Sequence, residues 1–164
     1  MRFIAAALVC LSILSAPGLA QHDPSAHEQH MADLTKHGAE AMGFDQDKTT
    51  HHFRLYKDGG AVEVQANDPA DTASIGQIRR HLKEQAMKFA AGDFSAPHHT
   101  HGQVPPGVDT MTRLRSKIQY DSQSTERGGR LRITTTDTQV LAAVHDFLRF
   151  QIKDHETGDK TSIE

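Results

Sequence analysis

Cysteine and tryptophan are the scarcest residues in this chain of 164, which contains one cysteine and no tryptophan. Cys10 lies inside an apolar segment that follows Arg2 and precedes a group of small residues ending at Ala20. This order is typical of a secretory signal peptide, which we place at residues 1–20. Removal of the signal peptide leaves no thiol, which excludes disulfides, cysteine nucleophiles and thiolate metal sites.

Long apolar runs and an excess of charge of one sign are also missing. No stretch beyond the signal peptide is apolar for long enough to cross a bilayer, so we expect no membrane span in the mature chain. The predicted location is therefore periplasmic or secreted. The chain has 18 Lys and Arg against 21 Asp and Glu. Without a basic excess, nucleic acid is not an expected partner.

Histidine is the residue type that the chain has in excess, with 12 copies. Imidazole is a good ligand for copper, zinc and nickel, and histidine-rich composition without cysteine is a compositional sign of metal binding. The alternative is that these histidines are scattered over the surface and contact only water.

A pattern of two strands followed by a helix occurs twice from residue 51 onward. In each copy, residues that alternate between apolar and polar flank a pair of glycines, Gly59-Gly60 and then Gly128-Gly129. Alternation around such a pair predicts a β-hairpin with the glycines in its turn. One ββα unit cannot bury its own apolar face, so we expect the two hairpins to join in one sheet.

Each hairpin precedes a segment with the apolar period of a helix. Asp71 and Asp137 are the predicted N-caps of the two helices. The predicted ends of the helices are the dipeptides Gly92-Asp93 and Gly158-Asp159. A further helix is predicted over about residues 26–42 by the capping box Ser25-Ala26-His27-Glu28 and by the glycine that follows it, Gly43.

The predicted fold class is α+β. Two ββα repeats form a four-stranded antiparallel sheet with two helices on one face, preceded by an N-terminal helix. The predicted organisation is a signal peptide at 1–20, a His-rich helix and linker at 21–50, and one domain at 51–159. Residues 93–110 contain prolines without periodicity and are predicted to be a long crossover loop.

The crossover segment carries the leading candidate for a metal site, His98, His99 and His101. Residues two apart in an extended segment face the same side, so His99 and His101 are expected to share one ion. His51 and His52, at the start of the first strand, are candidate completing ligands for copper or zinc.

Three other groups of histidines are weaker candidates. His30, Asp33, His37 and Glu40 share one face of the predicted first helix. A new amino terminus at Gln21, followed by His22, is a candidate Cu(II) chelate. The third group lies on the two helices of the repeats and consists of His81, His145 and His155, which are more often core residues than ligands or catalytic bases.

Four stretches resemble a family of small exported bacterial proteins that has no assigned function. They are residues 42–53, Gly92-Asp93-Phe94, Pro105-Pro106-Gly107-Val108 and residues 145–152. Members of that family are sometimes labelled aspartate carbamoyltransferase. The label does not fit this chain, because Ser124-Thr125-Glu126-Arg127 does not reproduce that enzyme's Ser-Thr-Arg-Thr-Arg signature. The resemblance implies the fold and export, and it implies no functional residues.

Three functions remain open from the sequence. The first is non-catalytic binding or handling of Cu, Zn or Ni. The second is an interaction or envelope-stress module whose basic sheet face contacts an envelope protein or forms a homodimer through Glu63. The predicted basic face consists of Arg54, Arg113, Arg115, Lys117, Arg130 and Arg132. The third is an enzyme of unrecognised type, which requires a pocket that gathers His81, His145 or His155 with a carboxylate.

Overall fold

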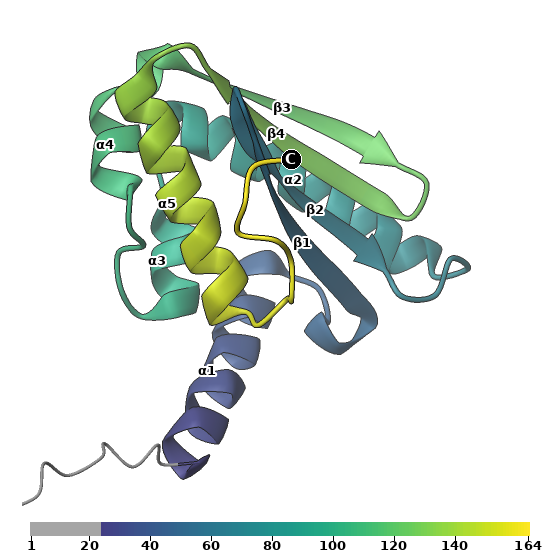
Figure 1. Cartoon of the computed structure of the whole chain (residues 1–164). Coiled ribbons are helices and arrows are strands. Elements are labelled where there is room, and N and C mark those ends of the chain that lie inside the picture. The colour runs from purple at the N-terminus through teal and green to yellow at the C-terminus, as the bar shows by residue number, and fades with distance from the viewer. Residues whose placement is uncertain (1–23) are drawn as a thin grey trace, which may run out of the picture.

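The computed structural model describes residues 24–164, so the predicted signal peptide, Gln21 and His22 lie outside the described residues. Figure 1 shows a sheet with helices packed on it and an N-terminal helix, α1, that extends away from the sheet. The elements are α1 (Pro24–Met42), η1 (Gln46–Lys48), β1 (Thr49–Tyr56), β2 (Gly59–Ala66), α2 (Thr72–Ala91), α3 (Ser95–His101), α4 (Val108–Arg113), η2 (Arg115–Lys117), β3 (Ile118–Thr125), β4 (Gly128–Thr135) and α5 (Thr138–Asp154). None of the helices in this part of the chain is long and apolar enough to cross a membrane.

The sheet is antiparallel, with the strand order β1-β2-β4-β3. This confirms the predicted α+β class, with a four-stranded antiparallel sheet preceded by an N-terminal helix. The two hairpins meet through their second strands, where Val62 pairs with Leu131. The apolar residues of the alternating strands lie on the face that the helices cover, and Leu55, Leu131 and Ile133 are at most 1% exposed.

The paired glycines occupy the strands and not the turns, which corrects the prediction. Gly59-Gly60 and Gly128-Gly129 are the first residues of β2 and β4. Gly60 lies against Leu148 of α5, and a Cβ atom there would also clash with the backbone oxygen of Arg54. A glycine at this position therefore allows a close approach of helix and sheet.

Each of the helices α2 and α5 packs mainly on the hairpin that it does not directly follow. α2 follows the first hairpin but packs mainly on β3 and β4, whereas α5 follows the second hairpin and contacts β1 and β2 (Figure 1). Asp71 and Asp137 cap these helices as predicted, by accepting from backbone N–H groups of their first turns. The order of strand, strand and helix is thus the same in both halves, while a common repeat remains a prediction.

The predicted end of the second helix is wrong. Gly92 ends α2 in the left-handed conformation, but α5 ends at Asp154 with His155 as its C-cap. The residues after α5 run along the edge of β1, where Asp159 accepts the N–H of Phe53 at 2.9 Å. The helix does not reach Gly158-Asp159 because these residues cover the edge strand instead.

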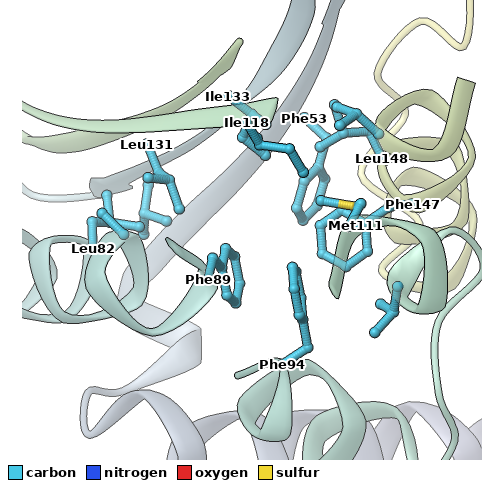
Figure 2. Close-up of a cluster of buried hydrophobic side chains, with 14 of the residues drawn as sticks. Phe53, Leu82, Phe89, Phe94, Met111, Ile118, Leu131, Ile133, Phe147 and Leu148 are labelled. Carbon is cyan, nitrogen blue, oxygen red and sulfur yellow. The ribbon is translucent and has the colours of Figure 1, made fainter. Parts of the chain in front are cut away.

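The crossover at residues 93–110 was predicted to be a long loop, and this prediction is wrong. It contains the short helix α3 and the start of α4. Phe94 anchors the segment, because its ring stacks on Phe89 at 4.5 Å between ring centres and lies 6.1 Å from the ring of Phe147. Figure 2 shows these rings together with Met111 of α4, which is fully buried. Tertiary packing, which local periodicity does not reveal, makes this segment helical.

The close approach at Gly60 predicts a stability difference between two glycine variants. Gly60→Ala should lower the free energy of unfolding by about 1–3 kcal/mol, because the added methyl group forces apart α5 and β2. Gly76→Ala, inside α2, meets only the flexible end of Arg80 at 3.5 Å, and should raise stability by roughly 0.5–1 kcal/mol. Urea unfolding of both variants measures the difference. Equal effects of the two changes would contradict this account of Gly60.

Candidate functional site

A cavity of about 80 Å³ lies beneath the sheet, near the start of β1 and the ends of α3 and α5. We call it the inner cavity. Four histidines line it, namely His51, His81, His101 and His155. The rest of its wall consists mainly of apolar side chains, and no Asp or Glu of the described residues belongs to it.

Four different elements bring these imidazoles together. His51 lies two residues before Phe53 on β1, so both side chains point to the covered face of the sheet. His81 lies in the middle of α2. His101 is the last residue of α3, and His155 directly follows α5. Residues far apart in the sequence thus meet at one place only through the tertiary fold.

The rings are close to one another. The rings of His51 and His155 are stacked, with centres 6.0 Å apart and planes 7° from parallel. The ring of His101 stands nearly perpendicular to that of His155, at 5.0 Å. Phe44 packs edge-on against His81 at 5.5 Å and lies over His51 at 6.2 Å. His155 is therefore the middle member of a row of three imidazoles.

His101 is oriented by Asp154. Its Nδ1 donates to Oδ2 of Asp154 at 2.6 Å, and the other carboxylate oxygen lies 3.1 Å from Nε2 of His30 on α1. Its Nε2 lies 2.9 Å from Oε1 of Gln151, on the cavity wall. If the Gln151 amide is reversed, its N–H group donates to a neutral His101. Asp154 thus connects α1 and α3 to α5 and determines which nitrogen of His101 faces the cavity.

Three buried polar atoms near the cavity have no hydrogen-bond partner among residues 24–164. They are Nε2 of His51, Oε1 of Gln85 and Nε2 of Gln151. Gln85 and Gln151 are each 5% exposed, and all three side chains line the inner cavity. Buried polar groups are nearly always hydrogen-bonded. The wall therefore presents unused hydrogen-bonding and ligating capacity to whatever enters the cavity.

Burial keeps most of these imidazoles neutral. It lowers the pKa of His51 from 6.5 to about 4, with a smaller contribution from the neighbouring His81 and His52. Burial likewise lowers the pKa of His81 to about 4 and that of His155 to about 3. A neutral imidazole has a lone pair on one nitrogen, which can accept a hydrogen bond or bind a metal ion.

A second cavity, of about 240 Å³, lies under α1. We call it the outer cavity. Met31 and Leu34 of α1 form one side of it, and His51 and His155 line it as well as the inner cavity. The stacked rings of His51 and His155 therefore lie between the two cavities.

The five histidines predicted as metal ligands are divided by the structure. His51 and His101 line the same cavity, whereas His98, His99 and His52 are not part of its wall. The extended geometry expected for His99 and His101 is wrong, because both lie in the helix α3. Residues two apart in a helix point to nearly opposite sides, so His99 is exposed where His101 is buried. His98 is exposed as well.

Two of the predicted ligands that do not line the inner cavity, His99 and His52, contact carboxylates elsewhere. Nε2 of His99 lies 3.4 Å from Oε2 of Glu40, and this pair joins α3 to α1. Nδ1 of His52 lies 3.0 Å from Oδ1 of Asp159, in the segment along the edge of β1. These contacts attach α1 and the C-terminal segment to the domain.

The weaker candidate groups also have separate partners. His145 faces the backbone oxygens of Tyr56 and Gly59 at 2.9 and 3.0 Å, which gives it a structural role. The predicted face of α1 does not form a common site. His30 contacts Asp154, and Asp33 contacts Gln29 of the same helix. His37 and Glu40 both contact His99 of α3.

The basic sheet face is smaller than predicted and is paired within the chain. Arg113 and Arg115 lie in α4 and η2, because the strand begins only at Ile118. Three arginines of the face lie on the sheet and form ion pairs. These pairs are Arg54 with Glu164, Arg130 with Glu63, and Arg132 with Asp58. Glu63, the expected dimer contact, is therefore engaged in an ion pair of its own chain.

The imidazoles are near one another but not yet arranged as ligands. Among residues 24–164, no three His, Cys, Asp or Glu side chains stand in positions to hold a metal ion. Two imidazoles that bind one ion at about 2.0–2.1 Å have ring centres roughly 5–6.5 Å apart. The spacings of 5.0 and 6.0 Å around His155 fall in this range.

Comparisons with known proteins identify no relative: no family model, no curated protein and no solved structure matches the chain.

The lowered pKa of His51 predicts that stability decreases in mild acid. Its unfolded-state pKa is 6.5 and its folded-state pKa about 4, so protons bind the unfolded state first as the pH falls. The stability present above pH 6.5 should therefore decrease between about pH 6.5 and pH 4, by about 1–2 kcal/mol from pH 7 to pH 5 for this group. His155 and His81 should add to this effect.

Urea unfolding across this pH range measures the decrease. His51→Leu should reduce the pH dependence, whereas His98→Gln, an exposed change on α3, should leave it as in the wild type. A stability that does not change between neutral pH and pH 5 would contradict the lowered pKa values, because the imidazoles would then bind protons in the folded protein over the same pH range as in the unfolded chain.

Proposed function

We propose that this protein is an exported, non-catalytic binding protein for a transition-metal ion, with copper, zinc and nickel as the candidate ions. The inner cavity is the proposed site, and His51, His101 and His155 are its ligands. The observation that carries the proposal is the convergence of three imidazoles from three elements, one with a buried and partnerless Nε2. Export is supported by the signal-peptide pattern of residues 1–20.

The size of the inner cavity favours an ion over an organic ligand. An apolar cavity of about 150 Å³ is known to bind benzene, and the inner cavity is about half that size, at about 80 Å³. This space admits an ion with one or two water molecules. The cavity is also lined by unsatisfied nitrogens, which an organic molecule of that size would not satisfy together.

The surroundings of His101 are typical of a metal ligand. Metal-bound histidines usually donate their second ring N–H to a carboxylate, which fixes the ring and increases the basicity of the ligating nitrogen. Asp154 has this relation to His101 at 2.6 Å. Removal of the carboxylate should therefore weaken metal binding even though Asp154 itself does not line the cavity.

The same pair of side chains supports a second candidate function. A histidine oriented by a carboxylate is also the arrangement of a general base. His81 and His155 line the same cavity as His101, while the carboxylate of Asp154 lies behind His101 and outside the wall. The small volume of the cavity argues against a substrate larger than a few atoms. Hydration of acetaldehyde, a substrate of three heavy atoms, by metal-free protein and its loss in Asp154→Asn would favour this second function.

Calorimetric titration tests the proposed metal site. The purified protein, titrated with Zn(II), Ni(II) and Cu(I) near pH 7, should bind at least one ion at micromolar affinity or tighter, about −8 kcal/mol or better. His51→Leu and His155→Leu preserve side-chain volume and should abolish binding. The matched controls are His98→Ala and His99→Ala, on the exposed side of α3, which should bind as the wild type does.

Circular dichroism of each variant confirms that the fold is kept. Binding that is lost in the controls and kept in the cavity variants would move the site to the surface of α3. The absence of saturable binding for every ion would overturn the proposed function.

A further inference from the structure

We infer that the inner cavity selects a monovalent soft ion, Cu(I), and that Met42 is a further ligand. This inference rests on the proposed metal site and specifies the kind of ion that occupies it. It follows from the charge of the cavity wall and from the chemistry of the donor atoms present there.

The charge of the wall opposes a divalent ion. None of the described residues that line the cavity is an Asp or Glu, and its imidazoles are neutral ligands. An ion bound there keeps its whole charge in mainly apolar surroundings. The cost of burying an ion increases with the square of its charge, so a divalent ion costs about four times as much as a monovalent one.

One carboxylate lies behind the ligands, and it matches a single positive charge. Asp154 contacts His101 on the side away from Gln151, and it is shared with His30. Its negative charge compensates for one elementary charge on an ion bound by His101. A divalent ion would keep one uncompensated charge, or it would need to bring a hydroxide into the cavity.

The donor atoms are those that Cu(I) prefers. Met42, the last residue of α1, lines the inner cavity with the histidines. Its Sδ accepts a weak hydrogen bond from Nε2 of Gln46 at 3.7 Å. Thioether sulfur combined with imidazole is typical of Cu(I), whereas zinc sites in proteins use thiolate, imidazole and carboxylate. Cu(I) also accepts two or three ligands, which suits a row of three imidazoles.

Competition titrations test the selectivity. The full protein is titrated anaerobically with Cu(I) in the presence of bicinchoninate, and separately with Ag(I) as a redox-inert probe and with Zn(II). Cu(I) and Ag(I) should bind at least about 100-fold more tightly than Zn(II). Met42→Leu should weaken Cu(I) and Ag(I) binding about tenfold or more and leave Zn(II) binding unchanged. Met87→Leu, at a methionine that is 59% exposed on α2, is the matched control and should change neither.

A direct readout is the methyl resonance of each methionine in an NMR spectrum. Stoichiometric Ag(I) should shift the resonance of Met42 and leave that of Met87 in place. Tighter binding of Zn(II) than of Cu(I), or an unshifted Met42 resonance, would overturn this inference and leave the metal site intact. The failure of every ion to bind would instead overturn the proposed function itself.

Discussion

The need to cover one apolar face of a four-stranded sheet is the constraint on which the rest of this structure depends. Two long helices pack on that face, α2 mainly on the second hairpin and α5 mainly on the first. The crossover segment fills the space between them, with Phe94 stacked on Phe89 and adjacent to Phe147. The inner cavity lies where this aromatic filling ends, between the rings of Phe89 and Phe147 and the histidines near the start of β1 and the ends of α3 and α5.

Polar contacts hold the remaining segments around that cavity. Asp154, at the end of α5, contacts His101 of α3 and His30 of α1 through its two oxygens. Glu40 and His99 form a second contact between α1 and α3. A surface pair of this kind contributes little to stability, but the buried contact of His101 with Asp154 positions a cavity residue. Some histidines therefore join helices to one another, and others line the inner cavity.

The sequence predicted those elements whose signals lie within a few neighbouring residues, and it missed those that depend on tertiary contacts. Alternation and capping revealed the strands and the starts of α2 and α5, because those signals lie within a few neighbouring residues. The crossover helix was missed because α3 is held by Phe94 and α1 rather than by its own periodicity. Of the predicted ligands, His51 and His101 meet in one cavity. His99 is separated from His101 by the helical geometry of α3, and His52 is separated from His51 by the alternation of β1. His81 and His155 were grouped with His145 and not with the predicted metal ligands, although a signal existed. Gln85 and Gln151 interrupt the apolar stripes of the two helices, one turn from His81 and His155 respectively.

The neutral imidazoles of the inner cavity are hard to explain as packing residues. His51, His81 and His155 are desolvated, and the buried Nε2 of His51 lacks a hydrogen-bond partner. Leucine or phenylalanine would fill the same space as His51 without an unsatisfied nitrogen. Selection for stability alone would therefore replace them, since an unpaired buried polar group lowers stability. A ligand that binds the folded state restores part of this loss, because it adds RT ln(1 + [L]/Kd) to the free energy of unfolding. The partnerless Nε2 of His51 and the carboxylate behind His101 are understandable together if the folded protein is completed by a small cation, and neither is needed if the cavity only ever holds water.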